Sequence, residues 1–143
     1  MVIHCMLCCF TFIHACRLQK LEKDAVKYWN NFYKNNTNHF FKDRHYLHRE
    51  IPEISQISNY CKERGLPSPV LLEVGSGVGN AIFPLIEDVP YLKVKTMDCS
   101  RYAVEEVLKK SPQYSPNWCE AHVCDIATQE FVRYRPYVDN TDV

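Results

Sequence analysis

Hydrophobic side chains recur at steps of three and four residues between residues 20 and 34, with lysine and acidic residues between them. This spacing is typical of an amphipathic helix, so it predicts a helix over residues 20–34 that ends at the polar run 35–38. Residues 51–64 show a second, shorter pattern of this kind. Because Gly65 and two prolines follow it, we expect the second helix to end at Gly65.

The hydrophobic pattern changes near residue 70. Residues 70–74 (VLLEV) form a short apolar run with β-branched ends, which is typical of a buried strand in a parallel sheet. Residues 91–97 and 121–124 are similar, and an aspartate follows each of them. Helical patterns over residues 80–87 and 101–110 separate these strands. Alternation of strand and helix predicts an α/β fold of the Rossmann-like type.

The two helices between the strands carry different signals. Ser100 can cap the second helix through its side-chain oxygen. The inward face of that helix should carry Ala103, Val104, Val107 and Leu108. Pro84 lies within the first helix, where its missing N–H group should produce a kink.

A glycine-rich loop follows the first strand directly, with the sequence GSGVG at residues 75–79. Glycine permits a tight turn and a close approach of the backbone to a ligand, so Gly75 and Gly77 are candidate binding residues. The helix after the loop would direct free N–H groups at the same place. Asp98, at the end of the second strand, can accept hydrogen bonds from both hydroxyl groups of a ribose. The alternative is that the glycines only turn the strand into the helix.

The spacing of this loop differs from that of dinucleotide-binding proteins. Their pattern is G-x-G-x-x-G, whereas this chain has G-x-G-x-G followed by Asn80. Glu73 precedes the loop, and a carboxylate there suits an ammonium group better than a pyrophosphate. S-adenosylmethionine carries an ammonium and a sulfonium group and no phosphate. The loop, Glu73 and Asp98 therefore favour S-adenosylmethionine over NAD, with an NAD-dependent oxidoreductase fragment as an alternative.

Four further residues are candidates for contacts with this cofactor. Asp125 follows the third strand, where it can accept a hydrogen bond from the adenine amino group while Ile126 packs on the ring; a helix cap is the alternative. Trp29 and Tyr33 are four residues apart and share one helix face. They are predicted either to pack in the core or to form a lid that stacks on adenine or faces the sulfonium.

The charges of the chain balance, with 17 Lys and Arg against 17 Asp and Glu, so no overall positive field indicates nucleic acid. Locally, residues 20–64 contain nine basic and six acidic residues. Residues 39–50 (HFFKDRHYLHRE) combine basic and aromatic side chains. Lys42 and Arg44 suit phosphate contacts, and the aromatic rings can stack on a base. A solvated basic face is the alternative.

Residues 1–19 form an apolar, cysteine-rich tail that we leave unassigned. Its apolar run, residues 2–16, is shorter than a membrane-spanning helix and has no basic start, so neither a membrane span nor a signal peptide is clearly indicated; a secretory or membrane-surface role is the alternative. Its histidines and cysteines lack the repeated spacing of a zinc site, so no metal is predicted. The remaining cysteines are scattered, which favours a reducing compartment, the cytoplasm or also the nucleus.

Residues 20–125 resemble a known enzyme family. The matching stretches are KLEKDAVKYWNNFYK, FFKDRHYLHREIPE, LLEVGSGVGNAIFPLIE, MDCSRYAVEEV and CDIA. They are similar to the methyltransferases that form 3-methylcytidine in the anticodon loop of tRNA, most of all to the type that acts on serine tRNA. The resemblance implies a class I methyltransferase fold, S-adenosylmethionine as cofactor and tRNA as substrate.

The resemblance also implies roles for single residues. Contacts with the cofactor are implied for Trp29, Tyr33, Gly75, Asp98, Asp125 and Ile126. Lys42, Asp43 and Arg44 are implied to lie near the substrate or to close over the methyl donor. We name no catalytic base, because cytosine N3 has a lone pair that can attack the methyl group directly.

The family's sheet continues beyond its third strand, so the chain looks like the amino-terminal half of that fold. We expect a helical lid or substrate segment at residues 20–69 and a partial cofactor-binding domain at residues 70–143. The resulting prediction is a tRNA cytosine-N3 methyltransferase that is impaired by truncation. The alternative is a non-catalytic fragment that binds the cofactor or a partner, either tRNA or an aminoacyl-tRNA synthetase.

Overall fold

The computed structural model describes residues 21–36, 41–114 and 119–128. Their helices and strands follow the order of the chain. The elements are α2 (Ala25–Asn36), α3 (Leu47–Glu50), α4 (Pro52–Glu63), β1 (Val70–Val74), α5 (Ile82–Asp88), β2 (Lys93–Asp98), α6 (Arg101–Lys110), the 3₁₀ helix η1 (Ser111–Tyr114) and β3 (Cys119–Val123).

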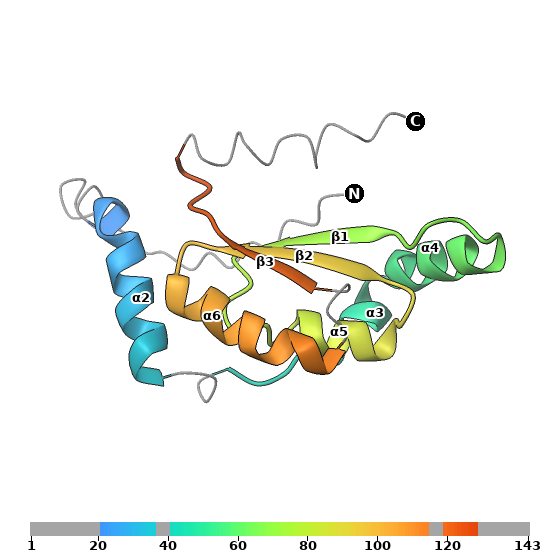
Figure 1. The fold of residues 1–143 in the computed structure, drawn as a ribbon, viewed down its shortest axis with the longest axis horizontal. Helices are drawn as coiled ribbons and strands as arrows, with labels where there is room; N and C mark the ends of the chain where they lie inside the picture. Colours follow the sequence, from blue (N-terminus) through green and yellow to red (C-terminus); the bar gives the residue numbers. More distant parts are fainter. Residues whose placement is uncertain (1–20, 37–40, 115–118, 129–143) are drawn as a thin grey trace.

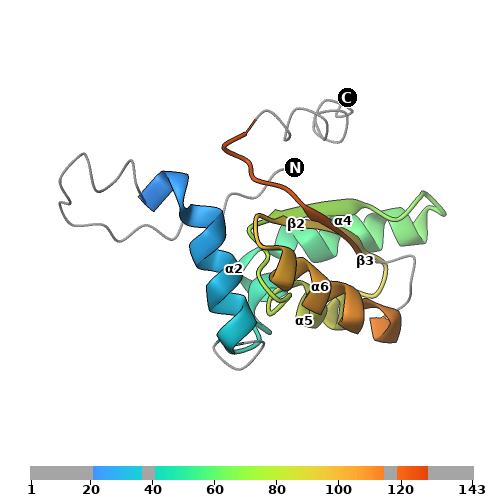
Figure 2. The ribbon, with the colours of Figure 1, turned by 60° about the vertical axis from the view of Figure 1, so that its left-hand side comes forward.

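The three strands form one parallel sheet in the order β1-β2-β3. Val74 is opposite Met97, and Asp98 is opposite Val123, so the carboxyl ends of all three strands lie at one edge. Figures 1 and 2 show α5 and α6 against one face of the sheet, and α2 beside the carboxyl ends of the strands. This arrangement confirms the predicted α/β, Rossmann-like fold for the three strands that the structure describes.

The core lies between the sheet and the helices α4, α5 and α6. Its buried apolar residues are Ile54, Ile82, Phe83, Leu85, Ile86, Val89, Leu92, Val94 and Val107. A smaller buried cluster joins Tyr33 of α2 to Val78 of the glycine-rich loop and Ala103 of α6. The hydroxyl of Ser100 also donates a hydrogen bond to Asn30 Oδ1 at 3.0 Å. These contacts fix α2 at the edge of the sheet where the strands end.

Several predicted elements are confirmed. β1 has the expected ends, and α4 lies within the predicted helix 51–64. Gly65 follows α4 in a left-handed conformation, with a φ of 65°, as expected of a helix-terminating glycine. Ser100 caps α6, because its Oγ accepts a hydrogen bond from the N–H of Ala103 at 3.3 Å.

Other boundaries differ from the prediction. α2 extends to Asn36, past the expected end of the helix, and the Asn36 side chain donates to the carbonyl of Phe32 at 2.9 Å. Asparagine therefore satisfies a backbone acceptor of the last turn instead of ending the helix. β3 begins at Cys119, because this residue pairs with Val94. The short helix α3 was not predicted.

Two predictions about the helices are wrong. Leu108 is 47% exposed, because the buried stripe of α6 consists of Ala103, Val104 and Val107 only. Pro84 does not interrupt a helix interior, because α5 begins at Ile82 and not at residue 80. Pro84 therefore lies in the first turn, where an N–H group needs no partner within the helix.

Candidate functional site

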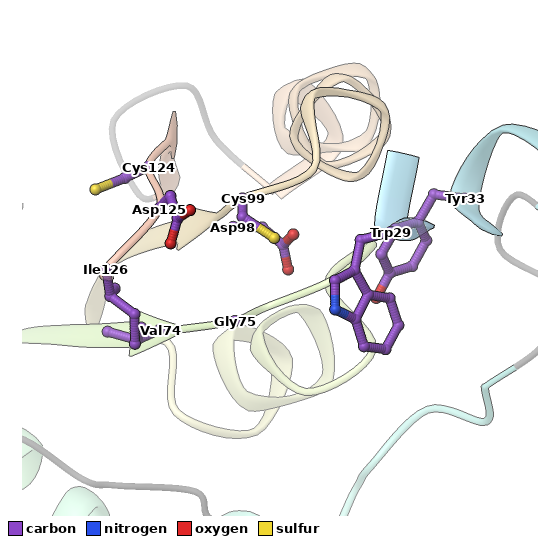
Figure 3. Close-up of a pocket in the computed structure, with 9 residues that line it drawn as sticks. All are labelled: Trp29, Tyr33, Val74, Gly75, Asp98, Cys99, Cys124, Asp125 and Ile126. Atoms are coloured by element: carbon purple, nitrogen blue, oxygen red, sulfur yellow. The ribbon is translucent and has the colours of Figure 1, made fainter. Parts of the chain in front are cut away.

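A pocket of about 280 Å³ lies where the strands end. We call it the tip pocket, and Figure 3 shows its lining. Trp29 and Tyr33 reach it from α2, and Asp125 and Ile126 enter from the opposite side, after β3. The complete lining is Trp29, Tyr33, Val74, Gly75, Asp98, Cys99, Cys124, Asp125 and Ile126. Six of the eight predicted cofactor residues are thus brought together.

Asp98 occupies the tip of β2 and is 6% exposed. Its Oδ2 accepts a hydrogen bond from the N–H of Gly77 at 2.8 Å, and its Oδ1 accepts one from the N–H of Ser100 at 2.8 Å. Burial raises the pKa of Asp98, and these two N–H donors act against that rise. A carboxylate oxygen has two lone pairs, so each oxygen can accept a second hydrogen bond from a ligand.

The glycine-rich loop needs glycine at its two predicted positions for different reasons. Gly75 has a φ of 74°, and a Cβ there would meet no atom within 4 Å, since the residue borders the pocket. Gly77 has a φ of 55°, and a Cβ there would lie 2.6 Å from the hydroxyl oxygen of Tyr33. The loop backbone therefore borders the pocket at Gly75 and packs closely against α2 at Gly77.

Trp29 and Tyr33 were predicted either to pack in the core or to form a lid over the ligand, and the two residues differ in their burial. Their rings are stacked, with centroids 5.9 Å apart and planes 25° apart. Tyr33 is buried in the small cluster with Val78, whereas Trp29 is 44% exposed at the mouth of the pocket. Burial, with a further contribution from Asp98, raises the pKa of Tyr33 to about 12, so its hydroxyl stays neutral.

On the other side of the tip pocket, Asp125 Oδ1 accepts a hydrogen bond from the N–H of Ala127 at 3.0 Å, which orients the side chain. Ile126 is 56% exposed and offers an apolar surface. Three lining residues, Val74, Cys99 and Cys124, were not predicted. Cys99 and Cys124 form no disulfide, and burial raises the pKa of Cys99 to about 11, so its thiol is neutral.

A second pocket, of about 180 Å³, adjoins the first. Both pockets include Trp29, Tyr33 and Gly75. We call the second one the strap pocket, because residues 41–46, which we call the strap, contribute to its wall. Its lining is Trp29, Tyr33, Phe41, Arg44, Glu73, Gly75, Ser76, Gly77, Asn80 and Ala81. The remaining two predicted cofactor residues, Glu73 and Gly77, are here.

Glu73 is a buried carboxyl group without a full set of partners. Its Oε2 is buried and has no hydrogen bond, and the same holds for Oγ of Ser76 in this pocket. Burial raises the pKa of Glu73 to about 7, with the charge of Arg44 acting against the rise and that of Asp98 adding to it. Buried polar atoms are rarely left unpaired, so the pair points to a polar ligand group at this position.

The predicted substrate residues take different positions. Arg44 is half-buried in the wall of the strap pocket, whereas Lys42 is exposed and lines neither pocket. Asp43 accepts a hydrogen bond at 2.9 Å from the side chain of Asn80. Sequence reasoning used Asn80 only to argue against NAD and missed this contact.

Within the described residues, no group of three or more His, Cys, Asp or Glu side chains is placed to hold a metal ion. None of their helices has the length and apolar character to cross a membrane. The histidines and cysteines of residues 1–19 lie outside this part of the chain.

Comparison with known proteins gives close relatives in one group of enzymes. The chain is 37% identical over 126 residues to tRNA N(3)-cytidine methyltransferase METTL6 of Homo sapiens and 40% identical over 124 residues to that of Mus musculus. It is 41% identical over 112 residues to tRNA N(3)-methylcytidine methyltransferase trm141 of Schizosaccharomyces pombe. The chain is a homologue of the tRNA N(3)-cytidine methyltransferases. The resemblance to the enzymes that form 3-methylcytidine in tRNA is thereby confirmed, whereas its serine-tRNA and anticodon-loop parts stay predictions.

The alignments cover 88%, 87% and 76% of this chain but only 43%, 42% and 41% of those three proteins. The chain therefore spans about two fifths of the length of these tRNA N(3)-cytidine methyltransferases. No protein-family model matches it.

Among solved structures, the chain is similar to magnesium protoporphyrin IX methyltransferase of Synechocystis with bound S-adenosylmethionine, at 17% identity and a TM-score of 0.45, over 75% of this chain and 55% of that one. It is also similar to the plantazolicin methyltransferase BamL, at 21% identity and a TM-score of 0.40, over 84% of this chain and 41% of that one. These scores are low, and the fold is established by the strand order of the chain itself.

Proposed function

We propose that the chain binds S-adenosylmethionine across the tip and strap pockets and forms the donor-binding part of a tRNA cytidine-N3 methyltransferase. The observation that carries the proposal is the tip pocket, where a buried aspartate and the open side of a glycine-rich loop meet. Homology to the tRNA N(3)-cytidine methyltransferases supports the choice of donor and substrate.

The tip pocket suits an adenosine group. The N–H groups of Gly77 and Ser100 use one lone pair on each oxygen of Asp98. The thiol of Cys99 also donates to this carboxylate and would have to yield its place for both ribose hydroxyl groups to bind. Asp125 can accept a hydrogen bond from the adenine amino group, and Ile126 offers an apolar surface for the ring. The exposed ring of Trp29 can cover the ligand from the side of α2.

The strap pocket suits the amino-acid end of the donor. Glu73 Oε2 lacks a hydrogen bond, and an ammonium group at this position would supply both a donor and a compensating charge. Glu73 and Asp98 together disfavour the pyrophosphate of NAD. When bound, S-adenosylmethionine supplies a methyl group activated by its sulfonium. The described residues hold that group in place; none is assigned as a base, because the attacking cytosine N3 carries a lone pair.

The finer parts of the proposal concern tRNA. Lys42 and Arg44 suit phosphate contacts, and Phe41 and Tyr46, which are 39% and 43% exposed, can stack on an unpaired base. We propose the anticodon loop as the target in the tRNA and residues 20–69 as the lid and substrate segment. The proposed compartment is the cytoplasm, and also the nucleus. An aminoacyl-tRNA synthetase is an alternative partner.

The first test is calorimetric titration of the chain with S-adenosylmethionine, S-adenosylhomocysteine and NADH. Binding of the first two at micromolar concentrations, without competition from NADH, is the expected result. Failure of both adenosyl ligands to bind would refute the proposal. Methylation of tRNA transcripts is then measured separately. Donor binding without turnover would favour the alternative, a non-catalytic binding fragment.

The tRNA part needs its own test. Lys42→Ala should weaken tRNA binding in a filter assay, with an effect that shrinks at high salt, as expected of a phosphate contact. Lys62→Ala, which removes an exposed charge from α4, is the matched control and should leave the affinity unchanged. Equal losses in both variants would indicate a general charge effect and no site at the strap.

A further inference from the structure

Asn80, between the glycine-rich loop and α5, makes two side-chain hydrogen bonds to the strap. Its Nδ2 donates to the carbonyl of Phe41 at 3.1 Å and to Asp43 Oδ1 at 2.9 Å. An amide nitrogen has two hydrogens, so these two acceptors use all of its donor capacity. The contacts join segments that lie 37 and 39 residues apart in the sequence.

The backbone of Asn80 makes a third contact with the strap, and Pro84 makes room for it. The carbonyl of Asn80 accepts a hydrogen bond from the N–H of Arg44 at 2.8 Å. In an α-helix this carbonyl would face the N–H of residue 84, four positions later. Proline has no N–H, so no helical hydrogen bond competes with Arg44. The helical pattern resumes on both sides of the gap, from Phe83 to Gly79 and from Leu85 to Ala81.

The other end of this segment lies close to the end of α5. Nδ1 of His48, in α3, lies 3.0 Å from Asp88 Oδ2, at the last residue of α5. The segment from the strap to α3 therefore follows α5: it is hydrogen-bonded to Asn80 before the helix and lies close to Asp88 at its end, where His48 Nδ1 makes no hydrogen bond. Arg44 lies between these two places, in the wall of the strap pocket with Glu73.

We infer that Asn80 is a positioning residue that holds the strap against α5 and so keeps Arg44 at the methyl-donor pocket. The inference rests on the proposed function only for the nature of the ligand. The strap itself has no helix or strand over residues 41–46, so few other backbone contacts restrain it. Removing the Asn80 amide would take away two of the three hydrogen bonds between residue 80 and the strap, keep the backbone bond from Arg44, and leave the buried core of α5 intact.

The test exchanges donor and acceptor between positions 80 and 43 in the full chain. Asn80→Asp replaces the donating amide by a carboxylate, although the carbonyl of Phe41 and the carboxylate of Asp43 are both acceptors. The new negative charge is also repelled by that of Asp43. Asp43→Asn alone keeps an acceptor oxygen for Asn80 and serves as the control. In the double variant, the new amide at position 43 can donate to the new carboxylate at position 80, so the link between these two side chains is restored with its polarity reversed, whereas the hydrogen bond to the carbonyl of Phe41 stays lost.

Two measurements are made on all four proteins. Amide hydrogen exchange of peptides covering residues 41–46 should be roughly tenfold faster in Asn80→Asp and within about twofold of wild type in the other two variants. The dissociation constant for S-adenosylmethionine should rise by about fivefold or more in Asn80→Asp and recover in the double variant, while the thermal midpoint stays close to wild type. A purely structural role would not produce recovery of affinity at an unchanged midpoint.

Each contrary result has a separate meaning. Unchanged exchange in Asn80→Asp would show that Asn80 does not hold the strap. Faster exchange with unchanged donor affinity would show that the strap does not serve the donor site. If the double variant does not regain donor affinity, the hydrogen bond between Asn80 and Asp43 is not what holds the strap. A wild-type chain that does not bind the donor would refute the proposed function, whereas the exchange measurement would still test the strap.

Discussion

Gly77 donates its backbone N–H to the carboxylate of Asp98 across 21 residues of sequence, at a distance of 2.8 Å and away from water. This contact attaches the glycine-rich loop after β1 to the tip of β2. It means that one carboxylate both shapes the loop and lines the tip pocket.

Replacing Asp98 with alanine should therefore damage binding and stability together. Two buried N–H groups lose their acceptor, which should lower the free energy of unfolding by about 2 kcal/mol, as measured by urea denaturation. The affinity for S-adenosylmethionine should fall at least about 30-fold in calorimetry, because two hydrogen bonds to a charged group are lost. Asp125→Ala is the control: it should lower the affinity with a change in stability below about 0.5 kcal/mol. Unchanged donor affinity in Asp98→Ala would contradict the assignment of the tip pocket.

A comparison of Gly75 with Gly65 distinguishes the effect of backbone strain from the effect of a methyl group that occupies space for the ligand. Both have a positive φ, 74° and 65°, and a Cβ at either would meet no atom within 4 Å. Alanine at either position should thus cost about 1 kcal/mol of stability. Only Gly75→Ala should also weaken binding of the methyl donor, because Gly75 borders both pockets and Gly65 borders neither. Similar donor affinities of the two variants would place the ligand elsewhere.

Glu73 should make the chain less stable as the pH rises. Its folded-state pKa of about 7 exceeds the ordinary value of 4.5, so its protonated form is favoured by folding. This stabilisation is complete below pH 4.5, declines between 4.5 and about 7, and is lost above that range. Denaturant unfolding of Glu73→Gln should lack the decline, whereas Glu63→Gln, an exposed change at the end of α4, should retain it. A decline of equal size in Glu73→Gln would show that another group is responsible.

An ammonium group beside Glu73 should favour its ionised form. Donor binding at pH 6 to 7 should therefore release a proton, which calorimetry detects as a dependence of the binding heat on the ionisation heat of the buffer. Glu73→Gln should bind without this dependence. A buffer-independent heat in the wild-type chain would mean that the ammonium group does not lie next to Glu73.

Trp29 should report donor binding by fluorescence. The chain has two tryptophans, and Trp118→Phe leaves Trp29 as the single indole. Because Trp29 is 44% exposed at the tip pocket, contact with an adenine ring should quench its emission or shift it to shorter wavelength. Titration with NADH gives the comparison ligand, and a signal that does not change with S-adenosylmethionine would leave Trp29 outside the binding site.

The fold could be predicted largely from local signals. β1 has the expected ends because an apolar run with β-branched ends is bounded by proline and glycine. Ser100 was found because a serine before an amphipathic stripe is a frequent helix cap. Helix ends that depend on tertiary contacts were missed. α5 begins at Ile82, and Asn80 before it makes contacts with the strap that no local pattern reveals.

The residues of the candidate site were also predicted only in part. Glycines and strand-end aspartates were found because the topology of a parallel sheet brings strand ends together whatever their distance in sequence. Cys99 and Cys124 were missed as lining residues because nothing in their neighbourhood distinguishes them from core cysteines. Lys42 and Arg44 are two residues apart, but only Arg44 faces a pocket, since the path of the strap and not its composition decides the direction.

Four stretches of chain, at residues 29–33, 74–75, 98–99 and 124–126, supply the wall of the tip pocket. None of them is adjacent to another in the sequence, so the wall exists only after α2 and all three strands have come together. A molecule held there cannot bind the unfolded chain in the same way. At a concentration 100 times its dissociation constant, it would add about 2.7 kcal/mol to the free energy of unfolding. The thermal midpoint of unfolding should therefore rise as a larger fraction of the pockets holds the ligand.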